Sequence, residues 1–247
     1  ERVLAVEVPP EHRTDIVIGR NAVQYSNFTK TTSDSGTFVN WGLIRSNSRT
    51  NPYGTGTTTS NSYVYNLTGE GVDVVIQDNG VMSGHPDFED ADGNTRFIEH
   101  NWYSAAGISG SMSSNHYGDV GSHGTHVAGI VAASRNNNIG AVGVANNVKI
   151  MSVRIVPDGD EHDKDVALAI RYAVDNGAKV INTSFGKGYS QNPEWVWDAI
   201  KYAGKKDVLI VNAAGNDGVD LDVTTSYPND QNGTGAEMSD NFITNIS

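Results

Sequence analysis

The sequence contains no cysteine among its 247 residues. Disulfide bonds, thiolate catalysis and metal coordination by cysteine are therefore excluded. No apolar run approaches the roughly 20 residues of a membrane-spanning helix, so we expect no membrane contact. Lys and Arg are scarce, with 17 against 29 Asp and Glu, which gives a net charge of −12. Because a surface that binds nucleic acid requires basic residues, we do not expect nucleic acid as a partner.

The first part of the chain differs in character from the rest. Residues 1–66 show little apolar periodicity and are rich in Ser, Thr, Asn and Gly, and the run 51–62 is almost entirely small or polar. Such composition is typical of a flexible connector. We therefore predict an N-terminal extension over 1–66 and a main domain over 67–247. The first residue is Glu1 rather than Met, and we expect that any signal peptide lay upstream of it.

The main domain alternates between predicted strands and helices. The β-branched run 72–77 is typical of a strand buried in a parallel sheet. We predict further strands at 148–155, 179–184 and 208–213, and helices at 163–176 and 194–202. This alternation predicts an α/β fold, with a parallel sheet flanked by helices on both faces. In such sheets, functional residues collect beyond the carboxyl ends of the strands.

Polar side chains stand at the ends of these strands. They are Asp78 after the first strand, Ser184, Phe185 and Gly186 after the third, and Asn216 after the fourth. Together they would place a carboxylate, an amide donor and a glycine-edged strand at one rim of the sheet.

A further polar stretch, Ser122 to His126, precedes a run of small and apolar residues that predicts a tightly packed helix. We expect Gly124 to let the backbone turn sharply and Thr125 to start the helix. The two histidines, His123 and His126, could be structural, catalytic or a pair of metal ligands, although the spacing is not that of H-E-x-x-H.

Six segments, taken in order, resemble the subtilase family of serine peptidases. They are VIQDNG (75–80), HPDF (85–88), HGTHVAG (123–129), NNIGAVGVA (137–145), VINTSFG (180–186) and AAGN (213–216). The resemblance implies a subtilisin-like fold and an endopeptidase that hydrolyses peptide bonds with an Asp-His-Ser triad. The substrate would be an extended polypeptide held between two edges.

The resemblance also implies a role for each matching residue. His123 would be the general base, oriented by Asp78, and Asn216 would donate a hydrogen bond to the oxyanion. Ser184, Phe185 and Gly186 would pair with the substrate backbone on one side, and Gly159 would lie on the opposite edge. Phe185 is also a candidate for the wall of a side-chain pocket, and the acidic run 217–222 hints weakly at basic side chains in the substrate.

A structural calcium site follows from the same resemblance. Asp87 and the side chain of Asn137 would supply oxygen ligands, with backbone carbonyls from Arg135, Ile139 and Ala141. Hard oxygen ligands on a tight loop suit Ca²⁺. The alternative is a loop held by asparagine hydrogen bonds alone. A cysteine-free extracellular protein would gain stability from such an ion.

The largest difference from the family is an absence. The family's nucleophile belongs to a G-T-S-M-A-x-P motif, which occurs nowhere in the 247 residues. Residues 241–247 resemble the strand before that motif, so we expect a domain that is incomplete at its C-terminus and lacks part of its core. Three explanations stay open. The sequence is part of a longer chain, the serine lies on a second polypeptide, or the protein is a natural form without catalysis.

A fainter resemblance links residues 40–43, 90–94 and 101–103 to subtilase-type proteins of marine bacteriophages. It implies a place in a virion, with virion proteins as partners. We therefore expect an extracellular or virion-associated location. A non-catalytic structural protein on a subtilase scaffold is the alternative to the enzyme. The stretch 92–120 is expected to be an insertion beside the substrate cleft.

Overall fold

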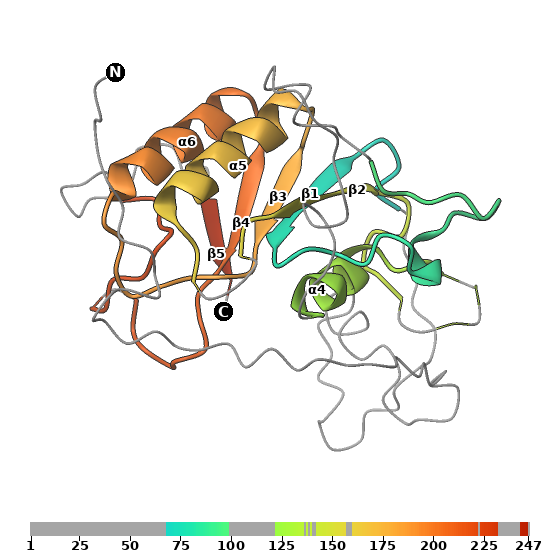
Figure 1. Cartoon of the computed structure of the whole chain (residues 1–247), viewed down its shortest axis with the longest axis horizontal. Helices are drawn as coiled ribbons and strands as arrows, with labels where there is room; N and C mark the ends of the chain where they lie inside the picture. The colour runs from blue at the N-terminus through green and yellow to red at the C-terminus, as the bar shows by residue number, and fades with distance from the viewer. Residues whose placement is uncertain are drawn as a thin grey trace, which may run out of the picture.

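Five parallel strands form one sheet at the centre of the structure, in the order β2-β1-β3-β4-β5 (Figure 1). They are β1 (Asp73–Asp78), β2 (Lys149–Arg154), β3 (Val180–Thr183), β4 (Leu209–Ala213) and β5 (Ile243–Ile246). The strands predicted at 72–77, 148–155, 179–184 and 208–213 are confirmed to within one residue at each end. The strand expected near the end of the chain is β5.

The computed structural model describes residues 68–98, 122–135, 137, 139, 142–156, 160–221, 223–231 and the backbone of 243–246. The predictions for the extension 1–66, for Gly159, for Ala141 and for most of the insertion 92–120 lie outside these residues.

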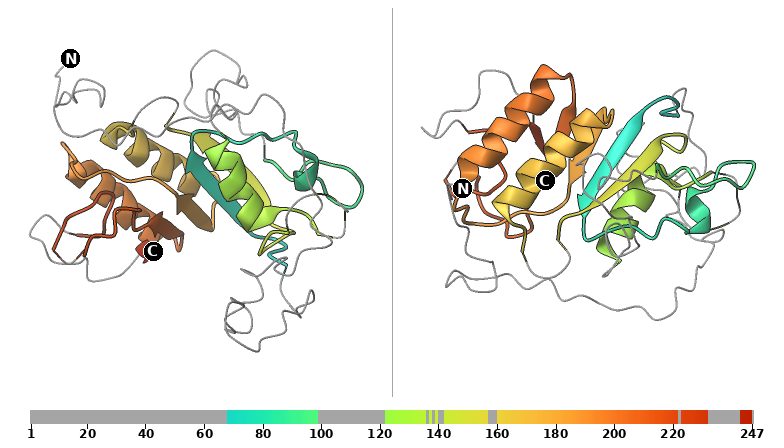
Figure 2. Two further views of the ribbon diagram at one scale, coloured as in Figure 1. Left: turned by 90° about the horizontal axis from the view of Figure 1, so that it is seen from below. Right: turned by 45° about the horizontal axis from the view of Figure 1, so that its top comes forward.

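Helices cover both faces of the sheet, as predicted. The pair α5 (Asp163–Asp175) and α6 (Pro193–Lys205) packs side by side on one face, and α4 (His123–Ala132) lies on the other, against β1 (Figures 1 and 2). Successive side chains of β1 point to opposite faces of the sheet and contact different helices. Val75 is buried with residues of α5 and α6, whereas Ile76 is buried with residues of α4.

The N-terminus of α4 corrects two expectations. The helix begins at His123, two residues before Thr125, and the left-handed backbone conformation belongs to Ser122, with φ of 64°. Gly124 is therefore a helical residue and does not make the turn. It is needed for close approach, because a Cβ there would overlap the carbonyl oxygen of Gly80.

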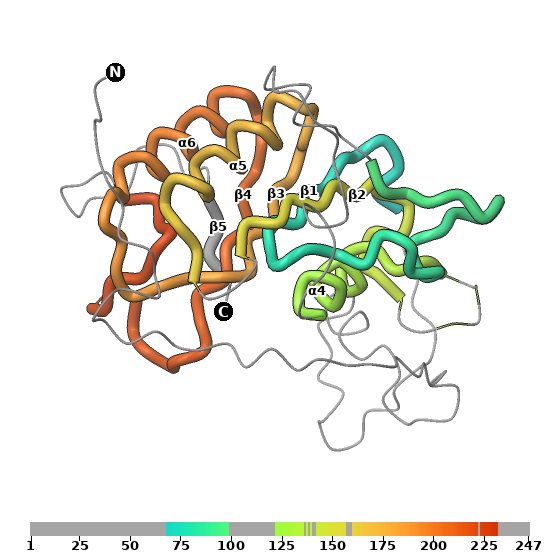
Figure 3. The backbone as a smooth tube through the Cα atoms, in the orientation of Figure 1, coloured from blue at the N-terminus to red at the C-terminus, as the bar shows by residue number. Residues whose placement is uncertain are grey.

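The strand order places a topological switch point between β1 and β3. From β1 the chain reaches β2 on one side. It then crosses the sheet through α5 to β3 on the other side of β1 (Figure 3). Adjacent connections diverge at such a point and leave a crevice at the carboxyl ends of the strands. Asp78 ends β1 and Ser184 follows β3, so both lie at this crevice.

One face of β4 is open in the described part of the chain. Leu209 is 44% exposed, whereas its neighbour Ile210, which faces α5 and α6, is 1% exposed. An apolar side chain on a central strand is normally covered. The side of the sheet that carries α4 therefore has an uncovered apolar area over β4.

Candidate active site

The carboxylate of Asp78 is fixed at the end of β1. The residue is fully buried, and its backbone oxygen accepts hydrogen bonds from the N–H groups of Ile155 and Val156 at 3.0 and 3.3 Å. One side-chain oxygen accepts from the N–H of Asn79 at 2.8 Å. The carboxylate thus has a defined position and faces the start of α4.

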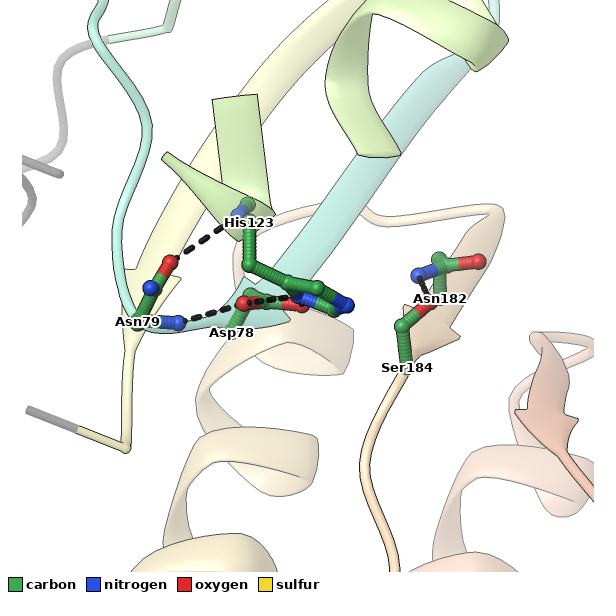
Figure 4. A network of polar contacts seen from close by, with 6 residues as sticks. Asp78, Asn79, His123, Asn182 and Ser184 are labelled. Atoms are coloured by element: carbon green, nitrogen blue, oxygen red, sulfur yellow. Dashed lines mark hydrogen bonds and ion pairs between the residues drawn. The ribbon is translucent and has the colours of Figure 1, made fainter. Parts of the chain in front are cut away.

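His123, the first residue of α4, meets this carboxylate directly. Its Nδ1 lies 2.8 and 2.9 Å from the two carboxylate oxygens of Asp78 (Figure 4). A carboxylate can only accept, so Nδ1 carries the hydrogen and Nε2 of the neutral ring carries the lone pair. The side chain of His123 is 45% exposed while that of Asp78 is 0% exposed. The ring can therefore take a proton at Nε2 from a group in the crevice.

A second contact holds the imidazole in place. The side-chain oxygen of Asn79 accepts a hydrogen bond from the N–H of Gly124 at 2.9 Å (Figure 4). This bond satisfies one of the free N–H groups in the first turn of α4. The end of β1 and the start of α4 are therefore joined by two contacts, the Asp78–His123 pair and the bond from Gly124 to Asn79. The sequence indicated no role for Asn79.

The end of β3 lies opposite the imidazole. Asn182 donates a hydrogen bond from Nδ2 to Oγ of Ser184 at 2.8 Å, and the free edge of the His123 ring is directed toward these two residues (Figure 4). Thr183 donates to Oδ1 of Asn212 at 2.7 Å, which joins the ends of β3 and β4. The segment expected to hold substrate thus shares the crevice with the expected base.

Asn216 lies on the loop after β4, at the same edge of the sheet. Its side chain is exposed, and it is flanked by Gly215 and Gly218, whose φ angles are 99° and 64°. Such positive φ values strongly favour glycine. They turn the chain away from the strand and leave the Asn216 amide at the surface.

Comparison with known proteins agrees with this geometry. The sequence model of the subtilase family matches residues 69–244. The chain belongs to the subtilase family. Thermitase of Thermoactinomyces vulgaris is 36% identical over 162 residues, which cover 65% of this chain and 52% of thermitase. An alkaline protease of Alkalihalobacillus alcalophilus is 31% identical over 228 residues, which cover 92% of this chain and 51% of that protein.

Solved structures give the same result. The S41 psychrophilic protease is 28% identical, with a TM-score of 0.53 over 73% of this chain and 53% of that one. Sphericase is 26% identical, with a TM-score of 0.50 over 75% of this chain and 55% of that one. This subtilase therefore spans about half the length of these relatives.

The side chain of Phe185, expected as a candidate pocket wall, is buried in the described structure. Its side chain is 2% exposed and belongs to the core beneath α5 and α6. Only its backbone can face a substrate. Directly after Gly186, which is exposed, the chain pairs with another segment. The backbone N–H groups of Lys187 and Tyr227 each donate to the other's carbonyl oxygen at 2.9 Å.

The expected calcium ligands of this subtilase come together in part. Asp87 is 4% exposed, and its Oδ1 accepts a hydrogen bond from Nδ2 of Asn137 at 2.8 Å. The N–H of Ile139 donates to Oδ1 of Asn137 at 3.2 Å. These contacts are those of the alternative expectation, a loop held by asparagine hydrogen bonds, and calcium binding would require the amide of Asn137 to turn its oxygen toward Asp87.

The structure does not test the expected carbonyl ligands Arg135 and Ala141. The side chain of Arg135 donates to the carbonyl oxygens of Gly143 and Val144, which leaves its backbone carbonyl, the expected ligand, untested. Ala141 lies outside the described residues. Nowhere in the described ranges, the Asp87 site included, do three His, Asp or Glu side chains converge on a possible metal site. The histidine pair His123 and His126 is accordingly not part of a three-ligand site of this kind.

A buried ion pair beside the substrate edge was missed by sequence reasoning. Nζ of Lys187 lies 2.6 Å from Oδ1 of Asp163, and the two side chains are 5% and 2% exposed. Lys187 also donates to the backbone oxygen of Glu161 at 2.8 Å. Burial acts to raise the pKa of Asp163, but hydrogen bonds from Lys187 and the Asn192 N–H outweigh it, and the pKa is lowered.

The pKa of the Glu161 carboxyl group is shifted in the opposite direction to that of Asp163. It is 1% exposed, and burial, together with its side-chain contact to Asp160, raises its pKa to about 8. The only sequence signal for these groups was their place, just after the segment 184–186 and just after Gly159. Position in the chain does not reveal that a charge is buried.

Proposed function

We propose that this chain supplies the base, the orienting carboxylate and the oxyanion donor of a serine endopeptidase that cleaves extended polypeptides. The observation that carries the proposal is the contact of the fully buried Asp78 with Nδ1 of His123 at 2.8 Å. Membership of the subtilase family and the protease relatives support it.

In the proposed mechanism, His123 accepts the proton of a serine hydroxyl at Nε2 while the serine oxygen attacks the scissile carbonyl carbon. The carbonyl oxygen becomes an oxyanion, to which Asn216 donates a hydrogen bond. His123 then gives the proton to the departing amine, and the acyl group remains on the serine. Water, deprotonated by the same nitrogen, releases the acid and restores the serine. Asp78 stabilises the imidazolium in both halves of the reaction.

The serine in this proposal comes from a segment outside residues 1–247 or from a second chain. The uncovered face of β4 favours such a segment. Leu209 on β4 and Ile130 on α4 are 44% and 67% exposed, although both are large and apolar. A further helix packed beside α4 would remove this apolar surface from water, and its end could present a serine to His123.

The substrate backbone in this proposal pairs with residues 184–186 on one edge and with the segment around Gly159 on the other.

We further propose that one Ca²⁺, bound by Asp87, Asn137 and carbonyl groups of the 135–141 loop, holds that loop in place. Such an ion would act on stability and not on the chemical steps. No helix in the described ranges is both long and apolar enough to cross a bilayer. An extracellular or virion location stays a prediction.

The test begins with the intact mass of the native protein, to establish whether the chain continues beyond Ser247 or is accompanied by a second polypeptide. Hydrolysis of an unfolded protein substrate is then measured for the native form, His123→Ala and Asp78→Asn. We expect His123→Ala to abolish hydrolysis and Asp78→Asn to lower kcat by about 10⁴-fold, because the ring then loses its orientation.

The matched control is His126→Ala. His126 is exposed on the same helix, one turn after His123, and its substitution should leave hydrolysis unchanged. A complete, folded protein that hydrolyses nothing would favour the alternative, a structural protein that retains the subtilase scaffold.

A further inference from the structure

The tripeptide Asp-Asn-Gly occurs at two places in the chain, residues 78–80 at the end of β1 and residues 175–177 at the end of α5. Asparagine is a thermolabile residue, and glycine after it favours deamidation because no side chain hinders attack by the glycine nitrogen on the asparagine amide. Since the two tripeptides are identical, a difference in their reactivity within the folded protein must come from the structure around them.

At the end of α5, hydrogen bonds hold both reacting groups. The N–H of Gly177, which carries the attacking nitrogen, donates to the carbonyl oxygen of Val174 at 3.2 Å. Nδ2 of Asn176, the leaving group, donates to the carbonyl oxygen of Tyr172 at 2.8 Å. Deamidation at this site would have to break both hydrogen bonds, so we expect the fold to protect Asn176.

At the end of β1, the corresponding groups are available. Within the described residues, neither the N–H of Gly80 nor Nδ2 of Asn79 donates a hydrogen bond to the protein. Asn79 is half-buried, so water can reach its amide group. The attacking nitrogen and the leaving group can therefore react without the loss of a hydrogen bond between protein groups.

The side-chain carbonyl of Asn79 faces the N-terminus of α4. Its Oδ1 accepts a hydrogen bond from the N–H of Gly124, in the first turn of the helix, at 2.9 Å (Figure 4). Attack on Cγ of Asn79 would move negative charge onto this oxygen. A backbone N–H at the positive end of a helix dipole stabilises such a charge, as the donors of an oxyanion hole do. The fold therefore favours at Asn79 the reaction that it hinders at Asn176.

We infer that Asn79 is a site of spontaneous deamidation, which the native fold accelerates relative to Asn176. Hydroxide takes the proton of the Gly80 N–H, the nitrogen attacks Cγ of Asn79, and the electron pair of the C=O bond moves to Oδ1. Collapse of this intermediate breaks the bond to Nδ2, which takes a proton from water and leaves as ammonia. Water then opens the succinimide ring at either carbonyl and gives aspartate or isoaspartate. The net reaction consumes one water and releases one ammonia.

Either product alters the junction between β1 and α4. Aspartate places a second carboxylate next to that of Asp78. Isoaspartate directs the backbone through the former side chain and lengthens the chain between residues 78 and 80 by one methylene group. His123 begins α4 and contacts Asp78, and a misplacement of about 1 Å in an active site costs roughly 10²-fold in rate. This effect on activity rests on the proposed function, whereas the deamidation itself does not.

The test incubates the complete native protein at mildly alkaline pH, with a reversible peptide aldehyde to prevent self-digestion. Peptide mapping by mass spectrometry follows both tripeptides, and isoaspartyl methyltransferase detects isoaspartate. We expect Asn79 to deamidate at least about tenfold faster than Asn176, because two hydrogen bonds hinder one site and an N–H donor assists the other. Incubation in urea is the matched control, in which the two identical tripeptides should react at similar rates.

Equal rates in the folded protein, or a faster loss of Asn176, would overturn the inference. A tenfold ratio that persists in urea would also overturn it, because the fold would then not be the cause.

A variant tests the effect on activity. Asn79→Ser has no amide to lose, and its hydroxyl can still accept from the N–H of Gly124. After the incubation and removal of the inhibitor, it should retain more of its own initial activity than the native protein does. Equal losses in both would overturn the effect on activity. Deamidation at Asn79 in a complete protein that hydrolyses nothing would support the modification site and count against the proposed function.

Discussion

Replacing Lys187 with methionine should destabilise the protein severely. Methionine keeps most of the aliphatic stem but removes the buried amine 2.6 Å from Asp163. At an effective dielectric constant of about 20, that separation corresponds to an attraction of about 6 kcal/mol, part of which offsets the desolvation of both groups. Removal of one partner leaves Asp163 buried and unpaired, so we expect a loss of about 3–5 kcal/mol in the free energy of unfolding.

The assay is urea unfolding at neutral pH, with Lys164→Met as the matched control. Lys164 lies next to Asp163 in the chain, but its contact with Asp165, 3.3 Å long, joins side chains that are 62% and 39% exposed. Solvent screens such a pair, so the control should lose less than about 1 kcal/mol. A second variant, Lys187→Met with Asp163→Asn, should recover part of the loss because the unpaired charge is gone.

A Lys187→Met variant that is no less stable than Lys164→Met would refute a stabilising role for the buried pair. A double variant as unstable as Lys187→Met alone would do the same, because the cost would then come from packing and not from an uncompensated carboxylate.

Three further predictions concern other parts of the molecule. The pKa of Glu161, about 8 in the folded state against 4.5 for an ordinary glutamate, means that its protonated form stabilises the fold below pH 4.5 and that this stability is lost as pH rises through 8. As pH rises from about 5 to about 9, the free energy of unfolding of Glu161→Gln should therefore increase relative to that of the native protein by roughly 2–4 kcal/mol. Gly124→Ala should lose about 1–3 kcal/mol in the free energy of unfolding and most activity, because its Cβ meets the Gly80 carbonyl. Gly129→Ala on the same helix, where a Cβ meets nothing within 4 Å, should be neutral or stabilising in thermal unfolding. A calcium chelator should lower Tm in the native protein but not in Asp87→Asn, and an equal shift in both would contradict the calcium site.

Much of the fold could be predicted because its signals are local. The β-branched run 72–77 and the amphipathic stretch 163–176 indicated β1 and α5, since burial on two faces or on one stripe leaves a pattern in the sequence. The start of α4 could not be placed in the same way. His123 begins it only because the end of β1 passes beside it, and Asn79 caps Gly124 across 45 positions of the chain.

The candidate site likewise combines residues that have a local sequence signal with contacts between distant segments that have none. Asp78 and His123 were predicted through a resemblance carried by contiguous motifs, and the structure brings them together. The pairing of Lys187 with Asp163 joins two segments that are distant in the sequence, and no local pattern marks it. The side chain of Phe185, a candidate pocket wall, lies in the core, and the sequence did not reveal this because a strand end does not show which way each side chain turns.

The most direct test of the central claim is labelling of the complete native protein with a serine-directed fluorophosphonate, followed by mass mapping of the adduct. We expect one modified serine, located outside residues 1–247, whose labelling is lost in His123→Ala and retained in His126→Ala. Labelling of a serine within residues 1–247, or equal labelling in His123→Ala, would contradict the claim that the buried Asp78 orients His123 to activate that nucleophile.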